Sequence, residues 1–124
     1  MHEASLVEGL LKLVLSTVDA ENSKALPGKK IRRICEIICE LGLFSCVEKQ
    51  TLTSCFELLA EGTLAEGAEL TLKTAPLNCT CCECGENFTV QTKKFHCPAC
   101  GSDNIQFDGG HGLVLYSLRV DTEE

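Results

Sequence analysis

The sequence predicts an α+β fold in which two helices pack on a small three-stranded mixed sheet, with a cysteine-rich module inserted before the last strand. Three observations carry this prediction. Two segments repeat apolar residues at helical spacing, and three others alternate apolar residues as strands do. Residues 77–111 differ from both, because they are rich in cysteine, glycine and polar residues and contain few apolar ones.

Two helices are predicted from stripes of apolar residues. In residues 4–21 the stripe consists of Val7, Leu10, Leu11, Val14 and Val18. Pro27 follows and prevents this helix from continuing. The stripe of the second helix consists of Leu52, Cys55, Phe56 and Leu59. We expect this helix to end near Gly62, and at its start Ser45 and Glu48 have the spacing of a capping box.

Three strands are predicted from alternating residues. In residues 31–41 the better buried face is expected to hold Cys35, Ile37, Cys39 and Leu41, opposite Glu36, Ile38 and Glu40. The second strand alternates Ala68, Leu70 and Leu72. The last strand alternates Val114, Tyr116, Leu118 and Val120. It is too apolar to remain unpaired, so we expect it to return to the N-terminal sheet. Gly42 and Pro76 end the first two strands.

The chain carries no recognisable export or membrane signal. No apolar run approaches the roughly 20 residues that cross a bilayer. The start, Met1-His2-Glu3, also lacks the basic and apolar regions of a signal peptide. We therefore expect a cytoplasmic protein that does not associate with membranes. Cytosolic thiols stay reduced, so the 10 cysteines indicate metal binding rather than disulfides.

The net charge of −7 argues against nucleic acid as a partner, because phosphate binding depends on basic charge. Both halves contribute to it. Residues 1–76 hold 8 Lys and Arg against 11 Asp and Glu, and residues 77–124 hold 3 against 7. We expect two domains: an α+β domain from residues 1–76 plus 112–124, and a four-cysteine zinc module from residues 77–111.

Two Cys-x-x-Cys pairs, separated by 12 residues, predict the metal site of this module: Cys81 with Cys84, and Cys97 with Cys100. Four thiolates at this spacing suit tetrahedral Zn(II), and iron is the main competitor. A site with four thiolates keeps no open position for water, so the zinc is expected to be structural. The chain also lacks paired carboxylates in a recognisable site and a phosphate-binding glycine loop, so we expect no enzyme activity.

Cys79 and Cys82 form a competing Cys-x-x-Cys pair. Glycine favours the pair Cys81 and Cys84 over this competitor. Gly85 follows Cys84 and Gly101 follows Cys100, at the position where such a turn needs positive φ. Glu83 after Cys82 suits that position less well. The remaining cysteines lie on apolar faces of predicted elements, where core packing is the simpler explanation: Cys35, Cys39, Cys46 and Cys55.

At a free N-terminus, Met1, His2 and Glu3 form a candidate nickel site. His2 is too bulky for efficient removal of Met1, so we expect the Met1 amine to survive. That amine, the His2 amide nitrogen and the His2 imidazole can close adjacent chelate rings, and Glu3 can add a nitrogen or a carboxylate. Such nitrogen-rich sets suit Ni(II) or Cu(II). A histidine at position 2 is also common as a simply solvated residue, and His96 and His111 are expected at the surface.

Together these residues resemble the HypA/HybF family of hydrogenase nickel-incorporation proteins. The resemblance covers nearly the whole chain. Besides Met1-His2-Glu3 and the two Cys-x-x-Cys-Gly turns, it rests on four segments: residues 42–48 (GLFSCVE), 55–57 (CFE), 61–63 (EGT) and 65–68 (AEGA).

The resemblance implies an α+β nickel-binding domain that carries a zinc-ribbon-like module. It implies that Met1, His2 and Glu3 bind Ni(II) as cargo, and that a purely structural zinc is held by Cys81, Cys84, Cys97 and Cys100. The implied partners are the family's GTPase HypB and the hydrogenase large-subunit precursor, with urease maturation factors in some organisms. The extra thiols of Cys79 and Cys82 depart from the common family pattern.

Two other functions remain open from the residues alone. The first is a zinc-ribbon adaptor that binds proteins and has no nickel function. The second is a redox enzyme that uses Cys-x-x-Cys, which would need an exposed thiol of low pKa.

Overall fold

The computed structural model describes residues 3–45 and 47–123, which form two compact units. The helical unit takes its described residues from positions up to 39, from 47–72 and from 115 onwards. The cysteine-rich unit comprises residues 40–45 and 73–114. The domain boundaries expected from the sequence stay a prediction. No helix in the described ranges is long and apolar enough to span a bilayer.

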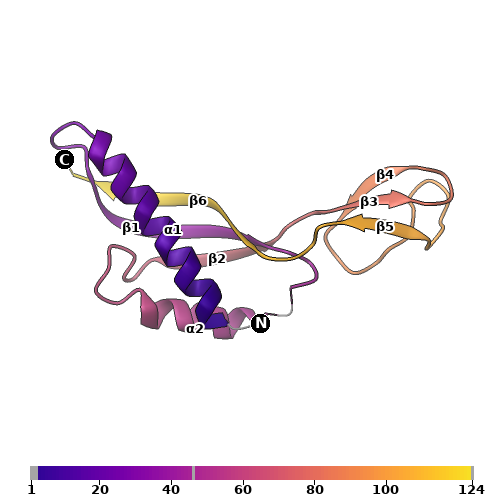
Figure 1. The fold of residues 1–124 in the computed structure, drawn as a ribbon, viewed down its shortest axis with the longest axis horizontal. Helices are drawn as coiled ribbons and strands as arrows, with labels where there is room; N and C mark the ends of the chain where they lie inside the picture. Colours follow the sequence, from indigo (N-terminus) through magenta and orange to yellow (C-terminus); the bar gives the residue numbers. More distant parts are fainter. Residues whose placement is uncertain (1–2, 46, 124) are drawn as a thin grey trace. The chain divides into compact units, whose positions relative to one another are not determined.

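The predicted order of helices and strands is confirmed. Helices α1 (Glu3–Lys24) and α2 (Lys49–Leu59) contact one another. A three-stranded sheet has the order β2-β1-β6. In Figure 1 the indigo helix α1 crosses the strands of this sheet. These strands are β1 (Ile31–Leu41), β2 (Glu69–Thr74) and β6 (Leu113–Thr122). The last strand therefore pairs with the N-terminal strand, as its apolar pattern predicts.

Hydrogen bonds define this sheet as mixed. Ala75 donates its backbone N–H to Leu41 at 3.0 Å, and Thr71 donates its hydroxyl to the Glu36 carboxylate at 2.7 Å. Later residues of β2 thus meet later residues of β1, so these strands run parallel. The opposite holds for β6, because Gly42 bonds to Gly112 and Glu123 bonds to Lys30. β6 is therefore antiparallel to β1.

The core of the helical unit follows the predicted helix stripes closely in α1 and less closely in α2. All five predicted residues of α1 are buried: Val7, Leu10, Leu11, Val14 and Val18. In α2 Leu52 and Phe56 are buried, whereas Leu59 is exposed and Ala60 is buried instead. The reason is that α2 ends at Leu59, so the buried row continues through its C-cap, Ala60.

The alternation predicted for two strands is only partly correct. In β1 the residues Ile37, Cys39 and Leu41 are buried as expected, but Ile34 is buried in place of Cys35. The Ile34 backbone N–H bonds to Leu64, outside the strands, and the alternation changes phase at this point. In β6, Val114 and Tyr116 are 60% and 64% exposed, so half of the predicted apolar stripe faces solvent.

The capping box predicted for Ser45 and Glu48 is wrong. Glu48 is the N-cap of α2, and no side chain donates or accepts a capping hydrogen bond there. Its carboxylate instead accepts the Thr51 hydroxyl at 2.7 Å. The Ser45 hydroxyl is committed elsewhere, because it accepts the backbone N–H of Gly112 at 2.9 Å. Ser45 therefore fastens two segments of the cysteine-rich unit rather than the start of α2.

The cysteine-rich unit contains a second sheet, antiparallel and ordered β4-β3-β5. Its strands are β3 (Leu77–Cys81), β4 (Asn87–Val90) and β5 (Ile105–Asp108). The sequence pattern does not predict them, because strands of four or five residues are too short to show a clear period. Aromatic rings also pack in this unit, with centroids 4.6 Å apart between Phe95 and Phe107 and 5.5 Å apart between Phe44 and Phe107.

Gly42 lies where two backbone segments of this unit touch, and we expect Gly42→Ala to destabilise it by about 1–3 kcal/mol. A Cβ at this position would lie 2.5 Å from the carbonyl oxygen of Gly110 and 2.7 Å from the nitrogen of His111. Backbone atoms cannot rotate away as a flexible side chain can. Urea unfolding of the zinc-loaded protein measures the loss.

Gly9→Ala is the matched control for this prediction. Gly9 lies in α1, and a Cβ there would meet no atom within 4 Å. Alanine should therefore stabilise the helix by about 0.5–1 kcal/mol. If Gly42→Ala were as stable as the wild type, the close contact with Gly110 would be wrong.

Candidate metal centre

Two turns of the same design present the four predicted cysteines. In the first turn Gly85 donates its N–H to the carbonyl of Cys81 at 2.9 Å, and in the second Gly101 donates to Cys97 at 2.8 Å. The first cysteine of each turn also donates its own N–H to the residue five positions later, at 2.9 Å in both cases. This shared pattern explains how sequence segments 12 residues apart hold their sulfurs in equivalent positions.

The glycine that follows each cysteine pair has positive φ, as predicted from the sequence. Gly85 has φ of 79° and Gly101 has φ of 77°. No residue other than glycine has positive φ in the described ranges. An L-residue with a side chain would be strained at either position. The glycines therefore account for the choice of Cys81 and Cys84 over Cys79 and Cys82.

The four sulfur atoms lie within 4.8 Å of one another, and within residues 3–45 and 47–123 no other group of three or more His, Cys, Asp or Glu residues is arranged to hold a metal. Two sulfur–sulfur separations cross between the turns, 3.6 Å from Cys81 to Cys100 and 3.5 Å from Cys84 to Cys97. A tetrahedral ion with metal–sulfur bonds of about 2.3 Å requires sulfurs about 3.8 Å apart. The cluster therefore fits a structural four-thiolate metal site such as that of zinc.

Backbone N–H groups point at the sulfurs and favour their thiolate forms. Ala99 and Cys100 donate to the Cys97 sulfur at 3.4 and 3.5 Å. At the other turn the Cys84 N–H donates to Cys81 and lowers the pKa of that thiol to about 7, although burial opposes the shift. Metal ligands must be deprotonated. The net pKa is lowered at Cys81 and Cys97, whereas at Cys84 and Cys100 a backbone hydrogen bond lowers the pKa but contacts with the neighbouring cysteines raise it overall. The cysteine spacing in the sequence does not predict these N–H donors, because their direction is set by the geometry of the folded turns.

The competing thiols lie outside the cluster. Cys79 is buried in β3, where its sulfur is 3.6 Å from the carbonyl of Leu77, and burial raises the pKa of this thiol. Cys82 is exposed, and its backbone N–H bonds to Asn104. Among the cysteines expected in the core, Cys39 is buried, which raises the pKa of its thiol to about 11. Cys35 and Cys55 are half-buried, and Cys46 lies outside the described residues.

The predicted nickel ligands are mostly beyond what the structure describes. Met1 and His2 lie outside the described residues, and Glu3 is the first residue of α1. The other two histidines are exposed, as expected. His111 contacts the ring of Phe44, with centroids 5.8 Å apart.

A family model described as "Hydrogenase/urease nickel incorporation, metallochaperone, hypA" matches residues 1–120. The chain belongs to the HypA family. Its resemblance to that family is thus confirmed over nearly its full length. It is 31% identical over 127 residues to the hydrogenase maturation factor HypA of Methanocaldococcus jannaschii, a match that covers 100% of both chains. It is 33% identical to HypA of Escherichia coli, covering 99% of this chain and 100% of the relative.

The fold also agrees with a solved HypA structure. The solution structure of the nickel metallochaperone HypA from Helicobacter pylori superposes with a TM-score of 0.64. The match covers 97% of each chain at 24% identity and shows the fold alone. This HypA chain is therefore an α+β member of a nickel-incorporation metallochaperone family for hydrogenase maturation, and it contains a four-cysteine cluster of the structural-metal type.

Proposed function

We propose that this chain binds Ni(II) through Met1, His2 and Glu3 and delivers it to the hydrogenase large-subunit precursor. The observation that carries the proposal is the match to the nickel-incorporation family, which begins at residue 1 and runs to residue 120. The three candidate ligands stand at the start of that match. Glu3 opens α1, so the proposed ligands directly precede or begin a long helix.

The chemistry of the proposed site favours a tetragonal cation. The Met1 amine, the His2 amide nitrogen and the His2 imidazole supply three nitrogens in adjacent chelate rings, and Glu3 supplies a further donor. Ni(II) accepts such a nitrogen-rich set.

The zinc would serve the fold rather than the transfer. We propose that Cys81, Cys84, Cys97 and Cys100 hold Zn(II), which supplies a fourfold cross-link between the two turns. Four thiolates exclude a bound water, so the protein has no turnover of its own. Its partners in this proposal are the GTPase HypB and the hydrogenase precursor, with urease maturation factors where the organism has urease. Neither nucleic acid nor a membrane takes part.

Equilibrium dialysis of the untagged, zinc-loaded protein against Ni(II) tests this function. We expect one Ni(II) per chain in addition to one Zn(II), with the zinc retained. An adaptor without a nickel function would bind zinc alone. A redox enzyme would instead reduce or form disulfides in a substrate, and turnover that a point mutation at one cysteine abolished would contradict a chaperone role.

A further inference from the structure

A basic loop, taken to include the last residue of α1 and the first three of β1, lies in an otherwise acidic chain. We use the name for residues 24–33, which contain Lys24, Lys29, Lys30, Arg32 and Arg33 and no carboxylate. Five of the 11 Lys and Arg residues therefore occupy ten consecutive positions, while the chain as a whole has a net charge of −7. All five side chains are exposed. Such a local reversal of charge concentrates an attractive field for anionic groups on one part of the surface.

The tip of the basic loop is a tight turn with an exposed apolar side chain. Lys29 donates its N–H to the carbonyl of Leu26 at 3.0 Å, and Gly28 has φ of 80°. With Pro27 before Gly28, this is the pattern of a type II turn. Leu26 is 72% exposed. Only its backbone carbonyl takes part in the turn, so the turn does not require a leucine side chain here. The turn thus displays an apolar side chain between cationic ones.

The base of the loop is fastened by Asn22. Its side-chain oxygen accepts the N–H of Ile31 at 2.7 Å, and its side-chain nitrogen donates to the Ile31 carbonyl at 3.2 Å. The backbone N–H of Ala25 also bonds to the Asn22 carbonyl, at 3.4 Å. These bonds tie the two ends of the connection to each other. A preorganised loop loses less conformational freedom on binding than a flexible one.

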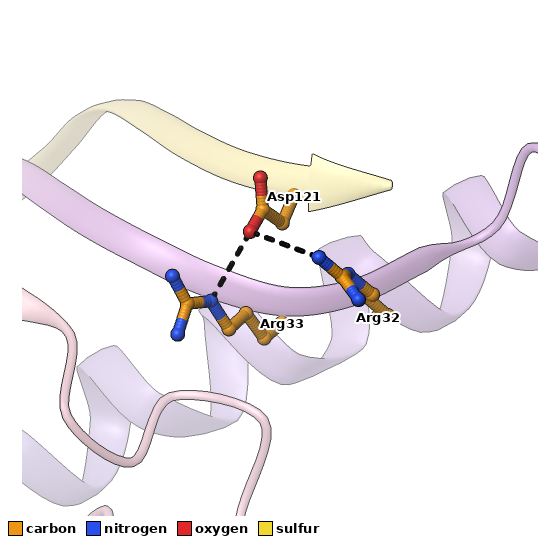
Figure 2. Close-up of polar contacts among 3 residues, drawn as sticks. All are labelled: Arg32, Arg33 and Asp121. Atoms are coloured by element: carbon orange, nitrogen blue, oxygen red, sulfur yellow. Dashed lines mark ion pairs between the residues drawn. The ribbon is translucent and has the colours of Figure 1, made fainter. Parts of the chain in front are cut away.

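The two arginines are also held in place. Figure 2 shows both guanidinium groups converging on Asp121 of β6, with separations of 3.6 Å from Arg32 and 3.3 Å from Arg33. A single carboxylate is shared by two cations, so one positive charge is left over. The arginine side chains remain 63% and 65% exposed, which leaves N–H donors available to another carboxylate.

A cavity of about 300 Å³ adjoins the loop. Lys24 and Lys29 line it together with the aliphatic side chains of Ile31 and Val120. Glu21 lines it too, so the cavity is not purely cationic. Asp19, Glu21, Asp121 and Glu123 are carboxylates of the neighbouring segments, against five cations in the loop. This combination suits an anionic side chain with an aliphatic stem.

We propose that the basic loop is a docking surface for an acidic protein segment that carries an apolar side chain. Fixed cations would pair with its carboxylates, and Leu26 would cover its apolar residue. Nucleic acid fits less well, because the rest of the chain repels phosphates and an exposed leucine has no role in binding them. The surface shares no residue with the proposed nickel ligands or with the four-cysteine cluster, so the proposal does not depend on either.

A labelled 12-residue peptide of Glu and Asp with one central Leu tests the proposal. In NMR titrations with the zinc-loaded protein, we expect the amide shifts to concentrate in residues 24–33 and 120–122. Lys29→Gln with Lys30→Gln should weaken binding about tenfold, because it removes two cations that pair with the carboxylates of the peptide. Leu26→Ser should weaken it about fivefold, because it removes the apolar contact with the central Leu. Raising the salt concentration should weaken binding as well.

Lys93→Gln with Lys94→Gln is the matched control, because it removes the same charge from an exposed pair in the other unit and should leave binding unchanged. The proposal is overturned if the wild type does not bind the peptide at low salt, if the control variant loses affinity equally, or if the shifts lie elsewhere. Tighter binding of a U12 RNA would assign the surface to nucleic acid. Self-association abolished by Lys29→Gln with Lys30→Gln would assign it to a second copy of the chain.

Discussion

Cys81→Ser is expected to release the zinc and unfold residues 77–111 while most of the helical signal persists. Binding of a structural zinc contributes about 10–16 kcal/mol in peptides, far more than three short strands can supply. The helices and their core lie in the other unit, so they do not depend directly on the cluster. Zinc content by mass spectrometry and far-ultraviolet circular dichroism measure the two effects. The same loss is expected for Cys84→Ser, Cys97→Ser and Cys100→Ser.

Cys79→Ser and Cys82→Ser are the matched controls, because each makes the same chemical change beside the cluster. Both variants should keep one zinc per chain. Cys82 is exposed, and a serine hydroxyl at position 79 can keep a hydrogen bond to the Leu77 carbonyl. Zinc lost from these two variants but kept by Cys81→Ser and Cys84→Ser would show that the other register holds the metal.

An added residue before Met1 is expected to abolish nickel binding and leave the zinc in place. The extension converts the Met1 amine to a neutral amide and displaces the chelate, while the core is untouched. His2→Gln should have a comparable effect, because it removes the imidazole but keeps a large residue that protects Met1 from removal. Neither change should alter stability by more than about 0.5 kcal/mol. The absorption bands of bound Ni(II), followed at constant pH, report the loss.

Nickel binding should also weaken as the pH falls through about 6 to 7, because an imidazole and an amine must lose their protons to bind metal. The affinity is then highest on the alkaline side and is lost on acidification. Zinc should remain bound over the same range if the two sites are independent, and simultaneous release of both metals would contradict that independence.

Much of the fold could be predicted because its signals are long. The stripe of α1, from Val7 to Val18, extends over about three turns, and all five of its residues are buried. The strands β3, β4 and β5 could not be predicted, because four or five residues are too few to show the alternation of apolar and polar residues that marks a strand. Leu59 and Tyr116 are exposed although the apolar pattern predicts burial. The pattern does not show at which residue a helix ends, or where along a strand the buried face switches from one side to the other.

The cysteine cluster could be anticipated from spacing together with glycine. Two Cys-x-x-Cys pairs are geometrically demanding, and positive φ after each pair distinguished Cys81 from Cys82. The role of Ser45 could not be inferred, because its partner, Gly112, is 67 positions away. The basic loop was missed for a different reason. Its five cations are close together in the sequence, but a run of cations is commonly just a solvated segment, and only the structure shows the turn and the Asn22 bonds that present them together.

The central claim is that nickel is bound by the N-terminus of this HypA protein, and a calorimetric Ni(II) titration of three zinc-loaded proteins tests it most directly. The three are the untagged wild type, a form extended by one residue before Met1, and His2→Gln. The proposal predicts one Ni(II) per chain for the wild type and no comparable binding for the other two. Equal nickel affinity in all three proteins would contradict it.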